Sequence, residues 1–177
     1  YSPAHNRAMS DLALDQVEAI VETWASQYRQ LVGNPKIGAV TIFENRGEMM
    51  GASNPHPHGQ IWATSSVPNQ LALEATRQAT YMASNRRPLL SDYLDRELAD
   101  AGRIVCANQH FVVLTPFWAA WPFETLLLPR RPAPDLASFS SDERRALAEI
   151  LRDITRTYDR VFEAPFPYTM GWHQRPT

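Results

Sequence analysis

The sequence predicts an α+β fold in which two related helix-and-strand units contribute to an antiparallel sheet. Apolar residues recur at helical spacing in two stretches, 17–32 and 147–162, which begin 130 residues apart. A turn rich in Pro or Gly and then a short apolar strand follow each helix, Ala39 to Phe43 in the first unit and Tyr168 to Trp172 in the second. This shared order predicts an internal duplication.

The two predicted helices match position for position. The first apolar stripe is Val17, Ile20, Val21, Trp24, Tyr28, Leu31 and Val32, and the second is Leu147, Ile150, Leu151, Ile154, Tyr158, Val161 and Phe162. Ser10 and Ser140 precede them as candidate N-caps. Two unrelated amphipathic helices can share this spacing by chance, but the common order of cap, helix and strand favours duplication.

The remaining elements divide the chain into three regions. Residues 1–68 form the closing part of the first unit, 69–101 a helical insert, and 102–177 the opening part of the second unit. The insert is predicted as two helices, 71–84 and 90–99, separated by Pro88. Further strands are expected at 103–107, 111–115 and 125–129. The first unit would lack its opening strands and the second its closing strand, so we expect the middle of a larger two-repeat protein.

The most informative motif is Ser53-Asn54-Pro55-His56-Pro57-His58-Gly59-Gln60, which runs into Ile61-Trp62-Ala63. If this segment is an extended strand, His56, His58 and Gln60 project from the same face. Burying three such groups without hydrogen-bond partners is costly, so the pattern predicts a functional site. A neutral imidazole can ligate a metal or attack phosphorus. A pair of structural histidines is the alternative interpretation.

Composition limits the classes of function. The chain has 177 residues, 44% of them hydrophobic, and a formal charge of −2 with no basic run. This argues against a nucleic-acid or anionic-membrane surface. Cys106 is the only cysteine, so no intrachain disulfide is possible, and we expect a small buried residue there. With no apolar stretch of membrane-spanning length and no secretion signal in the first thirty residues, we expect a cytoplasmic protein.

Four segments in the same order resemble the galactose-1-phosphate uridylyltransferase family, a branch of the histidine-triad superfamily. They are the motif at 53–60, Phe43-Glu44-Asn45-Arg46-Gly47, the segment 118–125 and the segment 168–173. The resemblance covers nearly the whole chain. It implies a histidine-triad-like antiparallel sheet with helices, part of a two-repeat architecture. It also implies uridylyl transfer between UDP-glucose and galactose 1-phosphate.

The resemblance assigns roles around the motif. His58 matches the histidine that becomes uridylylated, and Gln60 stands beside it as a donor to the phosphoryl group. The expected substrate-binding residues are Asn45, Gly51, Ala52, Ser53 and Gln60. Related hydrolases carry a third histidine at the position of Gln60, and an amide cannot shuttle a proton as that histidine can. Dinucleoside tetraphosphate phosphorylases share the glutamine and remain an alternative, as does a noncatalytic relic or structural half-protein.

The resemblance also implies metals and partners. His5 and His56 match two ligands of a structural zinc whose two cysteines would lie outside this sequence, while Glu74 and His173 match two ligands of an iron or zinc site. From the residues alone, His5, Glu74 and His173 could equally be surface side chains. The expected partners are UDP-glucose or UDP-galactose, a hexose 1-phosphate, and a second copy or a complementary chain that carries the missing strands.

Overall fold

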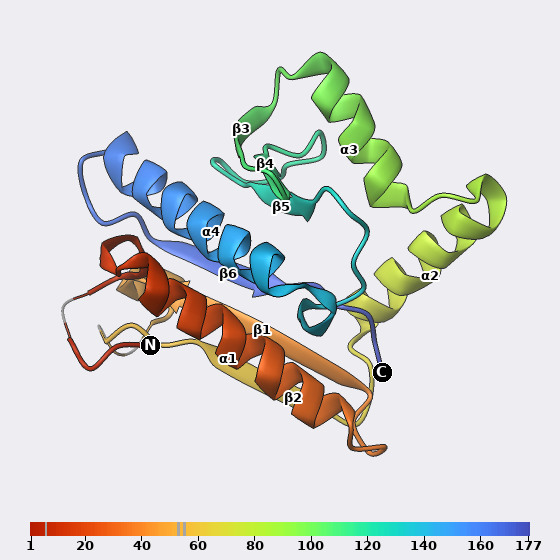
Figure 1. Ribbon diagram of the computed structural model, residues 1–177, viewed down its shortest axis with the longest axis horizontal. Helices are drawn as coiled ribbons and strands as arrows, with labels where there is room; N and C mark the ends of the chain where they lie inside the picture. The colour runs from red at the N-terminus through yellow and green to blue at the C-terminus, as the bar shows by residue number, and fades with distance from the viewer. Residues whose placement is uncertain (6, 53, 55) are drawn as a thin grey trace.

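The computed structural model describes residues 1–5, 7–52, 54 and 56–177. Figure 1 shows two long helices lying over a small sheet, with a second sheet and a helical pair beside them. In chain order the elements are η1 (Met9–Asp11), α1 (Leu14–Val32), β1 (Ala39–Arg46), η2 (Glu48–Met50), β2 (Gln60–Thr64), α2 (Asn69–Asn85), α3 (Leu89–Asp100), β3 (Ile104–Ala107), β4 (Phe111–Leu114), β5 (Leu126–Pro129), η3 (Leu136–Ser138), α4 (Ser141–Val161) and β6 (Tyr168–Trp172).

Two antiparallel sheets of three strands each organise these elements within the described residues. One has the order β2-β1-β6 and the other β3-β4-β5. The central strand β1 places Phe43 opposite both Gln60 of β2 and Gly171 of β6. The strands that follow the two predicted matching helices therefore pair antiparallel with each other, an arrangement compatible with the predicted duplication.

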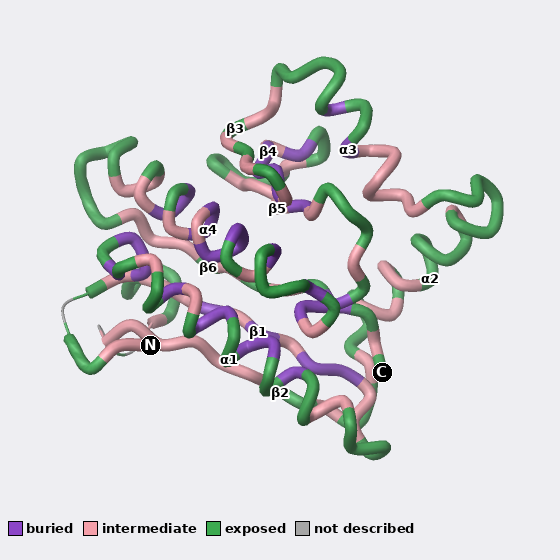
Figure 2. Tube along the Cα trace, in the orientation of Figure 1, coloured by how far each residue is buried: buried purple, intermediate pink, exposed green. Residues whose placement is uncertain are grey.

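The core lies between the β2-β1-β6 sheet and the two long helices. Alternate residues of β1 point to opposite faces, and Val40 and Ile42 on the inner face are buried with apolar residues of α1 and α4. Figure 2 shows the buried stretches of α1, α4 and β1 facing one another. The outward residues Thr41, Phe43 and Asn45 are only partly buried. The helices thus cover one face of the sheet and leave the other accessible.

The predicted N-cap is correct for one helix and wrong for the other. Ser140 caps α4, where its Oγ accepts the Glu143 backbone N–H at 3.2 Å and Glu143 Oε2 accepts the Ser140 N–H at 2.8 Å. Ser10 instead lies buried in η1, and its Oγ donates to Asp159 Oδ2 at 2.7 Å. Helix α1 begins after Ala13. The contact with Asp159, far away in sequence, takes the hydroxyl that the local pattern assigned to a cap.

The helical insert packs mainly through α3. Leu94 of α3 joins Val112, Leu114 and Leu128 of the β3-β4-β5 sheet in a second, smaller core. Cys106 of β3 is half-buried rather than fully buried as expected, and burial raises the pKa of its thiol. Among the described residues, no helix is long and apolar enough to cross a membrane.

Candidate functional site

The open face of the β2-β1-β6 sheet carries the polar residues of the expected site. Gln60 and Trp62 project from β2, Asn45 from β1 and Thr169 from β6, because each lies at an alternate strand position in register with Phe43. These side chains are partly or largely exposed, whereas the inward residues between them pack against the helices. One short sheet therefore supports a core on one side and a polar surface on the other.

The expected strand across His56 and His58 was wrong, because β2 begins only at Gln60. Residues 56–59 form a loop, and the motif supplies the reason. Pro57 has no backbone N–H to donate to a strand partner. His56 and His58 therefore do not alternate between the two faces of the sheet as strand residues do. His58 lies two residues before Gln60, the first residue of β2.

A backbone contact fixes the His58 ring. Its Nδ1 lies 2.8 Å from the backbone oxygen of His56. A carbonyl oxygen only accepts hydrogen bonds, so Nδ1 carries the proton in this contact and Nε2 of the neutral ring keeps its lone pair. The geometry thus selects the tautomer whose remaining nitrogen is a nucleophile.

Gly59 allows the N-terminal segment to pack under this loop. A Cβ at Gly59 would lie 2.0 Å from the Tyr1 hydroxyl oxygen, so a side chain there would displace the tyrosine. The Tyr1 backbone nitrogen also donates to the Pro57 oxygen at 3.2 Å, and the His56 N–H donates to Asn54 Oδ1 at 2.9 Å. One hydrogen bond from the N-terminal segment and one within the motif therefore hold the loop.

The two amides of the site have their oxygens engaged within the protein. Thr169 Oγ1 donates to Asn45 Oδ1 at 3.0 Å, and Trp62 Nε1 donates to Gln60 Oε1 at 3.2 Å. Neither NH2 group has a hydrogen-bond partner within the described ranges. Both amides can therefore donate to an anionic group at the open face.

The expected nucleotide-contacting turn is compact. Gly47 and Gly51 have φ of +89° and +79°, a conformation that favours glycine. The Gly47 oxygen accepts N–H groups from Met50 at 3.0 Å and Ala52 at 3.3 Å. The structure thus places Gly51 and Ala52 at the end of a tight turn that follows β1. Ser53, the remaining residue of this prediction, lies outside the described residues.

Sequence reasoning missed a buried carboxyl group on β1, the strand that pairs with β2. Glu44 projects from the inner face of β1 and is 3% exposed, and Tyr168 Oη donates to its Oε1 at 2.9 Å. Burial raises the pKa of Glu44, although the Tyr168 hydrogen bond and the charge of Arg46 act in the opposite direction. Glu44 Oε2 and Tyr1 Oη are buried without a partner among the described residues. The signal was available, since alternation in β1 puts Glu44 among core residues.

Both expected metal-ligand pairs are brought together. The rings of His5 and His56 have centroids 4.6 Å apart, and His56 Nδ1 is buried without a described hydrogen-bond partner. His173 Nδ1 lies 2.8 Å from Glu74 Oε2, although these residues are far apart in sequence. In the described part of the chain, no group of three or more potential ligands is assembled. Each pair supplies two of the four side chains that a tetrahedral metal site would need.

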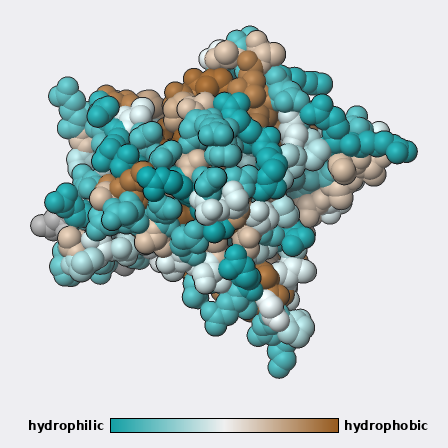
Figure 3. Space-filling view, viewed as in Figure 1, coloured by the Kyte–Doolittle hydropathy of each residue, from teal (hydrophilic) through white to brown (hydrophobic). Residues whose placement is uncertain are grey.

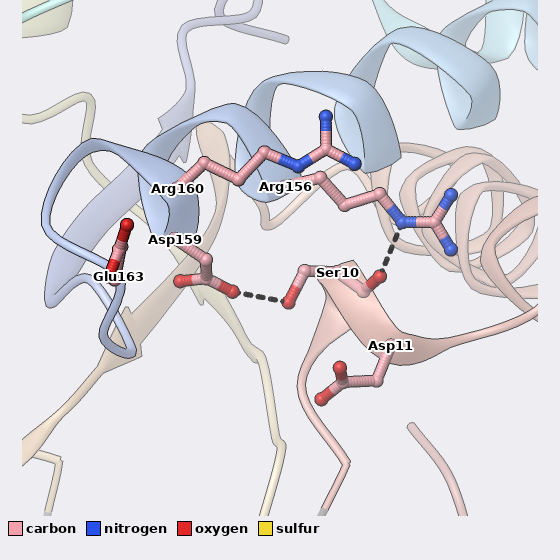
Figure 4. A pocket seen from close by; sticks show the side chains of 6 residues that line it. All are labelled: Ser10, Asp11, Arg156, Asp159, Arg160 and Glu163. Carbon is pink, nitrogen blue, oxygen red and sulfur yellow. Dashed lines mark hydrogen bonds between the residues drawn. The ribbon is translucent and has the colours of Figure 1, made fainter.

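A separate charged cleft of about 510 Å³ lies between η1 and the end of α4 (Figure 4). Its lining residues are Ser10, Asp11, Arg156, Asp159, Arg160 and Glu163. Arg156 Nε donates to the Ser10 oxygen at 2.7 Å, and Asp159 accepts from both Ser10 and Arg46. The lining holds three carboxylates and two guanidinium groups, a net charge of −1, so this cleft joins η1 to α4 and does not attract a phosphate.

Comparison with known proteins gives a consistent picture. A family model described as the N-terminal domain of galactose-1-phosphate uridyl transferase matches residues 1–68, and one described as its C-terminal domain matches residues 74–177. The galactose-1-phosphate uridylyltransferase of Haemophilus influenzae is 44% identical over 99% of this chain and 50% of its own length. A probable galactose-1-phosphate uridylyltransferase of Drosophila melanogaster is 40% identical over 100% of this chain and 50% of its own length.

Solved structures agree with this fold. A structure described as uridylyltransferase has a TM-score of 0.93 and 28% identity, covering 99% of this chain and 55% of that chain. An ADP-glucose phosphorylase from Arabidopsis thaliana has a TM-score of 0.88 at 22% identity, again over 99% of this chain and 55% of that chain, a likeness of fold alone. The chain spans about half the length of the curated relatives it matches.

Proposed function

The chain belongs to the galactose-1-phosphate uridylyltransferase family, and from this premise we propose that it carries the nucleophile for uridylyl transfer between UDP-glucose and galactose 1-phosphate. Because it spans half the length of its relatives, we propose this activity for the chain together with complementary segments. The observation that carries the proposal is the hydrogen bond between His58 Nδ1 and the His56 backbone oxygen. It leaves Nε2 unprotonated and free to attack.

The proposed reaction has two steps with one covalent intermediate. The lone pair of His58 Nε2 attacks the α-phosphorus of UDP-glucose, an N–P bond forms, and the P–O bond to the departing glucose 1-phosphate breaks. The imidazole then carries one positive charge, because its proton stays on Nδ1, which continues to donate to the His56 oxygen. A phosphate oxygen of galactose 1-phosphate next attacks the same phosphorus, the N–P bond breaks, and neutral His58 returns with UDP-galactose as product. Ping-pong kinetics follow.

Donors from the open face support the phosphoryl group in this proposal. A phosphate diester repels nucleophiles through its negative charge, so hydrogen bonds to its nonbridging oxygens lower the barrier. Gln60 and Asn45 are suited to this because their oxygens are held by Trp62 and Thr169 and their NH2 groups remain available. An amide has no titrating proton near neutral pH, so Gln60 does not activate water against the intermediate.

We propose two metal sites at the pairs described above. His5 and His56 would hold zinc, since a neutral imidazole is a zinc ligand and His56 Nδ1 is a buried nitrogen without a described partner. Glu74 and His173 would hold iron or zinc. A metal at each place would tie distant segments together, and further ligands would come from the complementary segments.

A protein partner is also part of the proposal. Strands β2 and β6 are the outer strands of their sheet among the described residues, and an unpaired strand edge invites another strand. Large apolar side chains are exposed, including Phe117, Trp118, Trp121 and Phe162. Figure 3 shows apolar surface along the upper edge of the molecule in that view. Association with complementary segments, or with a second copy, would cover such surface.

The activity can be tested in a completed complex, meaning this chain co-expressed with the complementary segments of the Haemophilus influenzae relative. We expect conversion of UDP-glucose and galactose 1-phosphate by the complex and none by the chain alone. A His58→Asn variant should lose at least about 1,000-fold in rate because it removes the nucleophile. His110→Asn is the matched control and should retain activity. A folded complex with no turnover would contradict the proposal and favour a noncatalytic role.

A further inference from the structure

Trp62 contacts the Gln60 amide but touches no reacting atom in the steps above. It follows Gln60 by two residues on β2, so both side chains project from the open face. Its ring meets Phe43 edge-on with centroids 5.5 Å apart, and its Nε1 lies 3.2 Å from Gln60 Oε1. The side chain is 59% exposed. An exposed indole gains little from burial, so its contact with the amide is the more informative feature.

Elementary hydrogen-bond chemistry makes this contact directional. The indole N–H is only a donor, so it can pair with the oxygen of the Gln60 amide and not with its NH2. The NH2 must then point the other way. Nonbridging phosphoryl oxygens only accept hydrogen bonds, so they need that NH2. One amide orientation satisfies both neighbours, and the opposite orientation satisfies neither.

We propose that Trp62 is a positioning residue that fixes the Gln60 amide with its NH2 toward the α-phosphoryl oxygens of a nucleotide. The inference rests on the proposed function, because it assumes a phosphoryl group at the open face. Phe43 holds the indole ring, and the indole in turn holds the amide. Thr169 engages the oxygen of Asn45 in the same way on the other side of β1. The open face therefore presents the NH2 groups of Gln60 and Asn45 as hydrogen-bond donors, and not their oxygens.

A double-mutant cycle in the completed complex tests the coupling. Trp62→Phe keeps an aromatic ring against Phe43 but removes the N–H. We expect it to slow uridylylation by UDP-glucose about 3- to 10-fold, since an amide free to turn presents its oxygen to the phosphate part of the time. In a Gln60→Ala background the same change should cost less than about 2-fold. Equal losses in both backgrounds, or no loss in either, would overturn the inference.

A second measurement does not depend on activity. The indole N–H resonance of Trp62, followed by ¹⁵N NMR in the completed complex, should move when Gln60 is changed to Ala, with the Trp121 indole as the unaffected control. An unmoved Trp62 resonance would overturn the inference even if uridylyl transfer is observed. Absence of transfer in the unsubstituted complex would instead contradict the proposed function, so the two failures are distinguishable.

Discussion

His58, Gln60 and Glu44, in and beside the motif, differ in whether they can gain or lose a proton. In the proposed mechanism His58 presents a lone pair, and the contact of its Nδ1 with the His56 oxygen selects the tautomer that does so. In the proposed mechanism Gln60 donates without titrating, because an amide has no titrating proton near neutral pH, and Trp62 engages its oxygen. Glu44, on β1, is a carboxyl group whose burial raises its pKa. Each property depends on the surroundings of the residue and not on its type alone.

Changing Gln60 to His should shift the balance from transfer to hydrolysis. A histidine there provides a group that can pass a proton to or from water near the uridylylated His58. We expect the ratio of UMP release to UDP-galactose formation to rise, even if the total rate falls. Product analysis by chromatography at equal conversion measures this ratio. An unchanged ratio in an active variant would mean that the amide does not protect the intermediate.

Glu44→Gln should change how stability depends on pH. The pKa of Glu44 is raised in the folded state by burial, so the folded protein binds more protons than the unfolded chain above its unfolded pKa near 4.5. Its stabilising contribution is therefore full below that pH and is lost as pH rises through the folded pKa. The Gln variant does not titrate, and Tyr168 can still donate to its oxygen.

Thermal unfolding midpoints of the two proteins check this sign. The difference between Glu44→Gln and the parent should become more favourable to the variant between about pH 5 and pH 8. A difference that stays constant over this range, or moves the other way, would contradict the assignment of a buried, destabilised carboxylate.

At the scale of the element, strand β1 shows what the sequence could predict and what it could not. Helical periodicity located α1, α2, α3 and α4, and β6 has the predicted bounds. Strand β1 runs three residues beyond the prediction because pairing with β6 extends to Arg46. That pairing joins segments more than 120 residues apart, and no local pattern encodes it.

The candidate site also has features that the sequence predicted and features that it did not. The resemblance and the motif named the members of both expected metal-ligand pairs, and the structure brings each pair together. Two of the sequence-based predictions were wrong, one because of a distant residue and one because of a residue within the motif. Asp159 takes the Ser10 hydroxyl from its expected capping role, and Pro57 prevents the loop before Gln60 from joining the sheet. Trp62 and Glu44 were missed because their importance comes from neighbours rather than from spacing.

The start of α4 depends on Glu143. This residue completes the capping box with Ser140 and pairs with Arg131 through two contacts of 2.8 and 2.9 Å. The hydrogen bonds from Arg131 lower the pKa of Glu143 to about 2, against the opposing effect of burial. The stabilisation is therefore present above its unfolded pKa near 4.5 and is lost as pH falls toward 2.

Glu143→Gln should lower the free energy of unfolding at pH 7 by about 1–2 kcal/mol, a modest value because Arg131 is half exposed and solvent weakens the pair. Chemical denaturation at pH 7 and pH 3 measures it. The deficit should shrink at pH 3. The exposed Glu163→Gln is the matched control, and an equal deficit at both pH values would contradict the role of the Glu143 charge.

At the scale of the whole molecule, two contacts link segments far apart in sequence. His5 meets His56 beside the motif loop, and Glu74 of α2 meets His173 just after β6. Each pair offers two ligands, and two protein ligands rarely retain a transition metal against water and chelators. We therefore expect each proposed metal site to be complete only when the complementary segments are present.

Metal content should depend on the complementary segments. The chain alone should be nearly metal-free after dialysis against a chelator, and the completed complex should retain metal. His56→Ala in the complex should remove zinc, and Glu74→Gln should remove the metal of the second pair without changing the first. Elemental analysis by mass spectrometry gives the stoichiometry. Stoichiometric metal in the isolated chain after this treatment would show that the ligand pairs are assigned wrongly.

The most direct test is to locate the uridylyl group. The completed complex is incubated with UDP-glucose labelled in its uridylyl part and without galactose 1-phosphate, then digested, and the acid-labile adduct is mapped by mass spectrometry. We predict the label on His58, at the nitrogen left free by the Nδ1 contact with the His56 oxygen. Label on His56, or on neither histidine in a complex that transfers uridylyl groups, would contradict the account.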